Sequence, residues 1–356
     1  MPLLRLSVLD QSPISEGATP AEALRNTVDL ARHADRLGYH RYWLAEHHGG
    51  VLVAGAAPEA LIGPIAARTR RLRVGSGGVM LPYYSPFKVA ETFAVLAGLF
   101  PGRVDLGIGR APGTDPMTMQ AVARDRTRPL PDDFPEQLRE LLAYYGDGFP
   151  EGHPLGRLAQ GMPRGDEAPQ VWLLGSSEQS AYWAGELGLP YSFADFIRAE
   201  GERAAEVYRD EFRPGATAAP RVSVGLAVLA AETEEEAVRL AASWRVAFSL
   251  LRRGRPVPVP PPGKALRFLQ REGKDPAEPP RSGRRIIGTP DRVREEVERV
   301  AAAYGAEEVV LLTITHDHEA RRRSYELLAR EFGLPAEGGA AGDEGAAPGQ
   351  APPAAG

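Results

Sequence analysis

The chain contains no cysteine among its 356 residues. This absence excludes disulfide bonds, thiolate catalysis, and zinc or iron–sulfur sites with cysteine ligands. The sequence also has no run of about 18 apolar residues, so it predicts no membrane-spanning helix. Its N-terminus lacks both the basic start and the long apolar stretch of a signal peptide. We therefore expect a cytoplasmic protein.

The composition is that of an ordinary globular protein, with 43% hydrophobic and 25% charged residues. This apolar fraction is enough for one large core. The formal net charge of -5 argues against general binding to nucleic acid or to an anionic membrane surface. From Pro335 onward Ala, Gly, Pro and acidic residues dominate. That bias predicts a disordered tail over residues 335–356.

Short apolar segments alternate with amphipathic helical segments along the chain. Helix starts are recognisable: Thr19 precedes Pro20 and lies three residues before Glu22, a capping-box pattern. The expected strands are 4–10, 42–45, 72–81, 104–108, 171–174, 191–194, 222–230 and 308–314. Eight strands that alternate with helices predict an α/β fold of the (β/α)8, or TIM barrel, type.

The expected barrel forms one domain over residues 1–334, which is longer than the roughly 250 residues that the fold requires. The surplus lies in loop insertions near 109–133, 146–169 and 252–285. The third insertion is rich in proline and is interpreted as a loop or lid. In this fold the loops at the C-terminal ends of the strands build the active site, so polar residues at those ends become the candidates.

A glycine-rich strand, RLRVGSGGVMLPYYSP at 71–86, is the most unusual stretch. Gly75, Gly77 and Gly78 fall within four positions, although glycine weakens a strand interior. Such a run indicates close approach of the main chain to a ligand or another strand, or an unusual peptide geometry. A β-bulge or a barrel corner would explain it equally well.

Polar side chains gather at four expected strand ends. An arginine, serine hydroxyls and a helix N-terminus together would suit a phosphate group. Each also has a simpler interpretation, because a serine can cap the helix and an arginine can form a surface ion pair. The candidates are Asp10, Glu46, His47, His48, Arg110, Ser176, Ser177 and Ser180.

The histidines allow several interpretations. His47 could act as a general acid or base, because imidazole titrates near neutrality, or it could simply pack beneath a loop. His316 and His318 form a His-x-His pair, but Asp317 between them suits a helix N-cap and we expect no metal site. The motif GIGRAPG at 107–113 lacks the spacing and surroundings of a dinucleotide fingerprint.

With these segments in order, the sequence resembles the bacterial-luciferase-like family of flavin-dependent monooxygenases. The resemblance is carried by YWLAEHH at 42–48, VGSGGVMLPYYSP at 74–86, GRVDLGIGR at 102–110, VWLLGSSEQSAYWAGELGLP at 171–190 and IIGTPDRV at 286–293. It implies a barrel that takes reduced FMN from a separate flavin reductase. O2 would then give a C4a-hydroperoxyflavin that oxidises a small organic substrate. Relatives commonly form homodimers.

The resemblance also implies roles for individual residues. His47 matches the active-site histidine, and Gly77 and Gly78 match a pair joined by a non-proline cis peptide that lies against the flavin ring. Arg110 matches the phosphate-binding arginine. The implied cofactor contacts are Ser76, Gly77, Gly78, Arg110, Gly175, Ser176, Ser177 and Ser180, and the candidate substrate contacts are Asp10, Glu46 and His48.

One position departs from the family pattern. The luciferase carries a reactive cysteine just before the arginine, where this chain has Gly109, so light emission is not implied. The LDQSP opening at 9–13 is similar to a branch whose substrate is unassigned. Two alternatives remain: an oxidoreductase that transfers hydride with the deazaflavin F420, and a non-catalytic flavin-binding protein. A Schiff-base aldolase barrel is disfavoured, because no lysine follows an expected strand.

Overall fold

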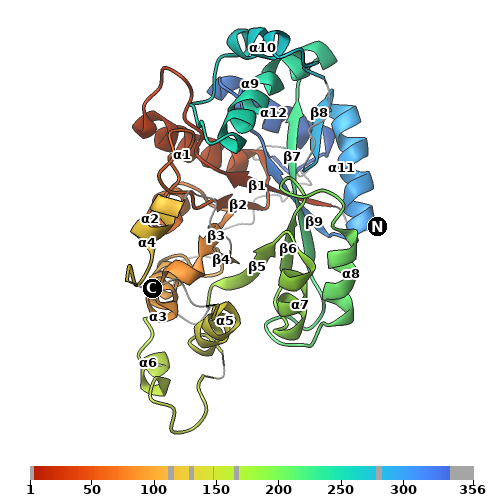
Figure 1. Cartoon of the computed structure of the whole chain (residues 1–356). Helices are drawn as coiled ribbons and strands as arrows, with labels where there is room; N and C mark the ends of the chain where they lie inside the picture. The colour runs from red at the N-terminus through yellow and green to blue at the C-terminus, as the bar shows by residue number, and fades with distance from the viewer. Residues whose placement is uncertain are drawn as a thin grey trace, which may run out of the picture.

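The computed structural model describes residues 4–110, 116–127, 132–146, 148–163, 168–277 and 283–336. Within these ranges nine parallel strands form one sheet, and eight of them close into a barrel that helices surround (Figure 1). The TIM barrel expected from the sequence is therefore confirmed. No helix in these ranges is both long and apolar enough to cross a membrane. Most of the tail predicted over 335–356 lies outside the described residues.

The barrel strands follow one another around the ring in chain order, and the last strand pairs back with the first. They are β1 (Arg5–Asp10), β2 (Arg41–Leu44), β3 (Arg73–Met80), β4 (Val104–Gly109), β5 (Gln170–Gly175), β6 (Tyr191–Ala194), β7 (Val222–Ala230) and β9 (Glu308–Leu312). Strands β3 and β7 stand four places apart in this ring of eight. They therefore face each other across the barrel.

A ninth strand, β8 (Arg285–Gly288), was not expected from the sequence. It pairs with the C-terminal part of β7, from Ala227 opposite Arg285 to Ala230 opposite Gly288. The N-terminal part of β7 pairs with β6 and β9 instead. At four residues, β8 is too short to show an alternating pattern, and only the protruding end of β7 gives it a partner.

The helices begin largely where local signals placed them. Thr19 caps the first helix, and the Glu22 carboxylate accepts a hydrogen bond from the main-chain N–H of Thr19 at 2.6 Å. The main helices are α1 (Pro20–Leu37), α2 (Pro58–Ala66), α3 (Pro86–Leu99), α5 (Phe134–Ala143), α7 (Glu178–Glu186), α8 (Glu202–Asp210), α9 (Glu234–Arg252), α11 (Pro290–Tyr304) and α12 (His318–Glu331). A single 3-10 turn, η1 (Leu81–Tyr83), follows β3.

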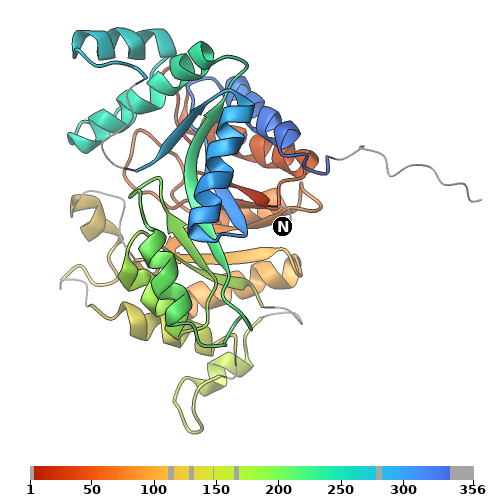
Figure 2. The same cartoon turned by 90° about the vertical axis from the view of Figure 1, so that its right-hand side faces the viewer.

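The three insertions contain short helices rather than continuous loops. They are α4 (Pro116–Val122), α6 (Gly156–Gln160) and α10 (Pro262–Arg271). Figures 1 and 2 show α6 projecting away from the barrel. In contrast, α10 packs on α9 through Ala265 and Leu269. The 252–285 segment, interpreted from sequence as a loop or lid, thus contains a packed ten-residue helix whose apolar face was obscured by the flanking prolines.

Side chains that alternate along each strand divide into an outer and an inner set. On β1, Leu6 and Val8 join the large core between the barrel and its helices, whereas Leu9 belongs to a second cluster with Trp43 and Trp172. This second cluster fills the interior of the barrel. The interior is therefore apolar toward the C-terminal ends of the strands.

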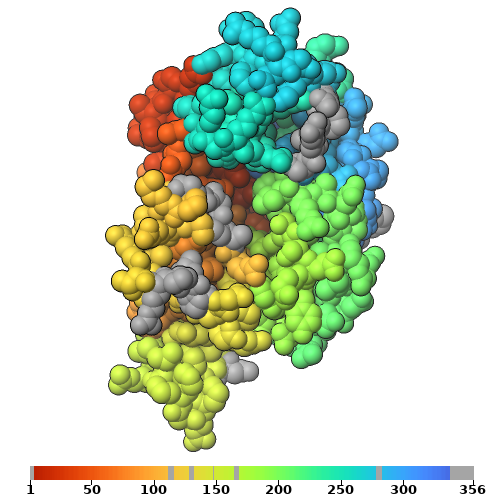
Figure 3. Space-filling view, in the orientation of Figure 1, coloured from red at the N-terminus to blue at the C-terminus, as the bar shows by residue number. Residues whose placement is uncertain are grey.

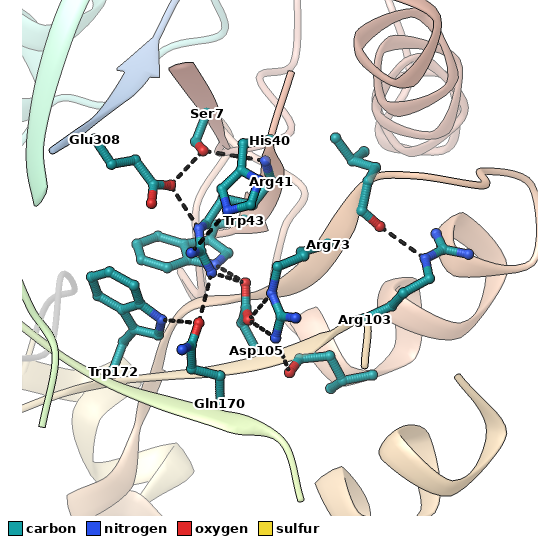
Figure 4. A network of polar contacts seen from close by, with 12 residues as sticks. Ser7, His40, Arg41, Trp43, Arg73, Arg103, Asp105, Gln170, Trp172 and Glu308 are labelled. Atoms are coloured by element: carbon teal, nitrogen blue, oxygen red, sulfur yellow. Dashed lines mark hydrogen bonds and ion pairs between the residues drawn. The ribbon is translucent and has the colours of Figure 1, made fainter. Parts of the chain in front are cut away.

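The N-terminal end of the barrel is closed by a buried polar network (Figure 4). The Arg41 guanidinium donates to the carboxylates of Glu308 at 2.6 Å and Asp105 at 2.7 Å. Arg73 also pairs with Asp105, at 2.6 Å. The charges of Arg41 and Arg73 lower the pKa of Asp105 against the effect of its burial, so this carboxyl stays ionised inside the barrel.

Arg41→Met tests the importance of this network. The substitution keeps much of the side-chain volume but removes the cation shared by Asp105 and Glu308, which leaves buried charge uncompensated. We expect the free energy of unfolding in urea to fall by about 3–5 kcal/mol. Arg253→Met is the matched control, because Arg253 forms an exposed pair with Glu272 and should cost at most about 1 kcal/mol. Equal losses in the two variants would contradict the interpretation.

Candidate functional site

The glycine-rich end of β3 forms one wall at the C-terminal mouth of the barrel. The peptide bond between Gly77 and Gly78 is cis, as the family resemblance implies. The pairing of β3 with β4 shifts register between Ser76 and Val79, so the β-bulge that the sequence left open is also present. The main chain of Gly77 and Gly78 is partly exposed. A bare stretch of backbone therefore faces the mouth.

Neighbouring groups explain why side chains are absent from this wall. A Cβ atom on Gly77 would lie 2.8 Å from both Leu9 and Trp43, and one on Gly78 would lie 2.7 Å from the Gly107 carbonyl oxygen. Real Cβ atoms do not tolerate such contacts. Barrel packing thus already requires glycine here, whether or not a ligand approaches.

Two tryptophans form the floor below this wall. The Trp43 and Trp172 rings meet edge to face with their centroids 5.3 Å apart. Their indole N–H groups donate to Asp105 at 3.0 Å and to Gln170 at 3.1 Å, which belong to the polar network beneath them. Sequence reasoning missed both tryptophans, because nothing local indicates that they share the barrel interior.

His47 follows β2 and is half-buried. Its main-chain N–H donates to Gly55 at 2.8 Å, whereas its buried Nδ1 atom has no hydrogen-bond partner in the described chain. Burial, reinforced by the nearby His48, lowers the pKa of His47 to about 4. The imidazole is therefore neutral at pH 7, and its Nδ1 atom is available to a ligand.

Glu46 and His48 belong to a buried cluster that sequence reasoning did not anticipate. The Glu46 carboxylate accepts hydrogen bonds from the Met80 N–H at 3.0 Å and from the Tyr84 hydroxyl. His48 Nε2 lies 2.7 Å from the same carboxylate. Burial and the Glu46 charge raise the pKa of Tyr84. Glu46 thereby fixes the end of β3 to the end of β2, which indicates a positioning role.

Two of the predicted contacts, Asp10 and Ser76, have buried side chains that bond within the protein. Asp10 is fully buried and accepts hydrogen bonds from Arg321 at 2.7 Å and from Tyr42, so it links β1 to α12. Ser76 is also fully buried, and its hydroxyl donates to Gly107 at 2.9 Å. Alternation along the strands directs both side chains out of the barrel interior.

The serines that the sequence predicted to bind a phosphate have different roles in the structure. Ser177 caps α7 by accepting from the Ser180 N–H, as the simpler interpretation proposed. The Ser180 hydroxyl donates to the Ser177 carbonyl at 2.7 Å and lies 3.0 Å from the Tyr191 hydroxyl. A Cβ on Gly175 would collide with Ser180. Ser176 is partly exposed and has no hydrogen-bond partner among the described residues.

Arg110 lies beside the same helix. It is exposed at the end of β4, and its guanidinium carbon lies 5.3 Å from the centroid of Trp183 on α7. Strands β4 and β5 are hydrogen-bonded neighbours, which brings Arg110 to the side of the helix that β5 introduces. Arg110, Ser176 and the N-terminus of α7 therefore occupy adjoining positions on one rim of the barrel.

The His-x-His pair is divided between two partners. His316 Nε2 lies 3.2 Å from the Glu16 carbonyl oxygen, and His318 Nε2 lies 2.9 Å from Asp29. Asp317 caps α12, as expected from the sequence. Over the ranges that the structure describes, no three His, Asp or Glu residues form a group that could hold a metal ion.

Comparison with known proteins agrees with this fold. The sequence profile of the luciferase-like monooxygenases matches residues 4–308. The N-acetyl-S-alkylcysteine monooxygenase of Bacillus subtilis is 39% identical, over 92% of this chain and 98% of that protein. A crystal structure of apo-MsnO8 is 42% identical with a TM-score of 0.86, over 94% of this chain and 100% of that one.

A more distant structure shares the fold alone. The oxygenating constituent of 3,6-diketocamphane monooxygenase from Pseudomonas putida, in complex with FMN, has a TM-score of 0.68 at 22% identity. It covers 93% of this chain and 98% of that one. The assignment rests instead on the profile match over most of the chain and on the closer relatives. This protein belongs to the luciferase-like monooxygenase family.

Proposed function

We propose that this protein is a monooxygenase that uses externally reduced FMN and O2 to oxidise a small organic substrate. The observation that carries the proposal is the partly exposed main chain of Gly77 and Gly78 at the barrel mouth, with the neutral His47 two strand ends away from Arg110. Family membership supports the oxidoreductase class. The reduced cofactor would come from a separate flavin reductase.

The residues present fit FMN at both ends. A flat tricyclic ring needs a wall without side chains, and Gly77 and Gly78 provide one beside the apolar Leu9 and Trp43. A phosphate needs a cation and hydrogen-bond donors. Arg110 would supply the cation, while the Ser176 hydroxyl and the first N–H groups of α7 would supply donors, since those N–H groups have no partner within the helix.

The chemistry divides between the cofactor and the chain. When bound, reduced FMN supplies the two electrons with which one oxygen atom of O2 becomes water while the other enters the substrate. His47 would accept or return a proton at Nδ1, the ring nitrogen that has no partner in the described chain. The apolar interior around Leu9 and Trp43 would exclude water from the reacting atoms.

Arg110→Ala tests the phosphate contact. Losing a charge-assisted contact should weaken FMN binding by about 10- to 100-fold. Riboflavin lacks the phosphate, so its affinity should hardly change. Flavin fluorescence titration measures both ligands, and Arg157→Ala, in the projecting helix α6, is the control. If riboflavin weakens as much as FMN, Arg110 does not hold the phosphate; tighter binding of F420 than of FMN would favour the hydride-transfer alternative.

His47→Asn tests the proton-transfer role. Asparagine keeps a polar side chain of similar size but cannot accept a proton near neutral pH. Oxidation of protein-bound reduced FMN by O2, followed by flavin absorbance, should slow by at least about tenfold, which is below the usual range for a lost general acid or base. FMN affinity should stay the same. His153→Asn, at an exposed histidine, is the control. An unchanged rate in His47→Asn would favour a non-catalytic flavin-binding protein.

The neutral state of His47 has its own test in the apoprotein. Because the folded pKa is about 4 and the unfolded value is ~6.5, the unfolded chain binds more protons between these values. The stability contribution is thus complete above pH 6.5 and is lost as pH falls toward 4. At about 1.4 kcal/mol per pKa unit, His47→Asn should reduce this loss by at most about 3.5 kcal/mol. Urea unfolding at several pH values measures it; an unaltered slope would contradict the assignment.

A further inference from the structure

A large cavity lies on the side of the barrel opposite Gly77 and Gly78, which we call the glycine wall. It has a volume of about 990 Å³ and lies between α9, α10 and β8, next to the C-terminal parts of β7 and β9. Its apolar lining includes Trp244, Phe248, Leu312 and Ile314. In Figure 3 the side chains of α9 and α10, in teal and cyan, form the upper part of the molecule. Its size suits a small organic molecule.

The cavity shares its lining with the interior of the barrel. Leu312 and Ile314 line the cavity and also belong to the interior cluster that contains Leu9 and Trp43. Those two residues flank Gly77. Because β7 faces β3 across the ring, the cavity and the glycine wall lie on opposite sides of this shared apolar cluster. The cavity is therefore placed to hold the part of a substrate that is remote from the reacting atoms.

Several cationic side chains and the carboxylate of Glu234 line this cavity. Three of the cations form ion pairs with Glu234 or Glu272. Arg253 pairs with Glu272 at 2.7 Å, and Lys274 lies 3.6 Å from the same carboxylate. Arg292 pairs with Glu234 at 3.2 Å. These three cations have their counter-charges within the protein, so they do not call for an anionic ligand.

Arg285 differs from these cations. It is half-buried, and among the described residues it has no carboxylate partner; Asp195, the acid that acts on it electrostatically, is engaged by Arg284 at 3.0 Å. Its Nη1 atom donates to the carbonyl oxygens of Phe196 at 2.8 Å and Arg284 at 2.9 Å. The guanidinium carbon lies 5.3 Å from the Phe248 ring centroid. Burial lowers the pKa of Arg285 to about 10, although the charge of Asp195 acts in the opposite direction.

The donors that remain on Arg285 have a specific shape. A guanidinium has five N–H donors, and the two carbonyls account for the two on Nη1. Nε and Nη2 have no hydrogen-bond partner in the described part of the chain. Together they form the edge of the guanidinium that binds a carboxylate through two parallel hydrogen bonds. A carboxylate there would also supply the missing counter-charge.

We propose that this cavity is a substrate subsite for a small amphipathic organic acid, whose carboxylate pairs with Arg285 and whose apolar part lies along Trp244, Phe248 and Leu312 toward the glycine wall. Calling this ligand a substrate rests on the proposed function. The binding site itself is defined without the flavin.

Isothermal titration calorimetry on the flavin-free protein tests this with two probes, 4-phenylbutanoate and the isosteric neutral 4-phenylbutanamide. The wild-type protein should bind the acid at least about tenfold more tightly than the amide, the effect of a charge-assisted bidentate contact. Arg285→Met should bind the two probes equally. Arg253→Met, which removes a neutralised cation from the same cavity, should retain the wild-type ratio.

A second variant of Arg285 and the wild-type protein itself complete the test. Arg285→Met removes the donors to two carbonyl oxygens, so Arg285→Lys is a second variant that keeps the charge and should retain part of the preference. The wild-type measurement needs no variant: equal affinity for acid and amide, or no binding of either, overturns the proposal. Because no flavin is present, failure of FMN binding in a separate titration would overturn the proposed function and leave the acid subsite standing.

Discussion

The close approach of the β3 and β4 main chains is the constraint on which the site depends. A Cβ on Gly75 would collide with the Asp105 carbonyl, and one on Gly107 would collide with the carbonyl of Ser76. Glycine at these positions lets the two strands pair, and the register of β3 against β4 shifts between Ser76 and Val79. The partly exposed main chain of Gly77 and Gly78 lies within this shift. One packing requirement therefore creates the surface on which the proposed function rests.

The two ends of the barrel have opposite chemical character. At the N-terminal end, buried charges centred on Arg41 close the barrel and hold the tryptophan floor by its indole N–H groups. Toward the C-terminal end the interior cluster is apolar, and the described chain places cations around its rim. Arg110 beside α7 and Arg285 beside β7 lie on different sides of that rim. The arrangement suits two anionic groups joined to apolar bodies that meet near His47.

The family resemblance and local signals predicted much of the fold and part of the site. The eight barrel strands, the Thr19 and Asp317 caps and the cis bond at Gly77 were all expected, because each has a signature within a few residues. Strand β8 and helix α10 were missed, since their short patterns are hidden among prolines and glycines. Ser76 was expected to contact the cofactor, and the structure adds that its hydroxyl donates to the Gly107 carbonyl.

The sequence by itself determined which chemical groups stand at the strand ends and that glycine interrupts the third strand, because strands, turns and caps follow from neighbouring residues. Only the tertiary structure decided which of those groups remain available. Asp10 is used by Arg321, which lies more than three hundred residues away in the chain, whereas Arg285 keeps one edge of its guanidinium unpaired. Such pairing depends on how distant segments pack, and no local pattern encodes it.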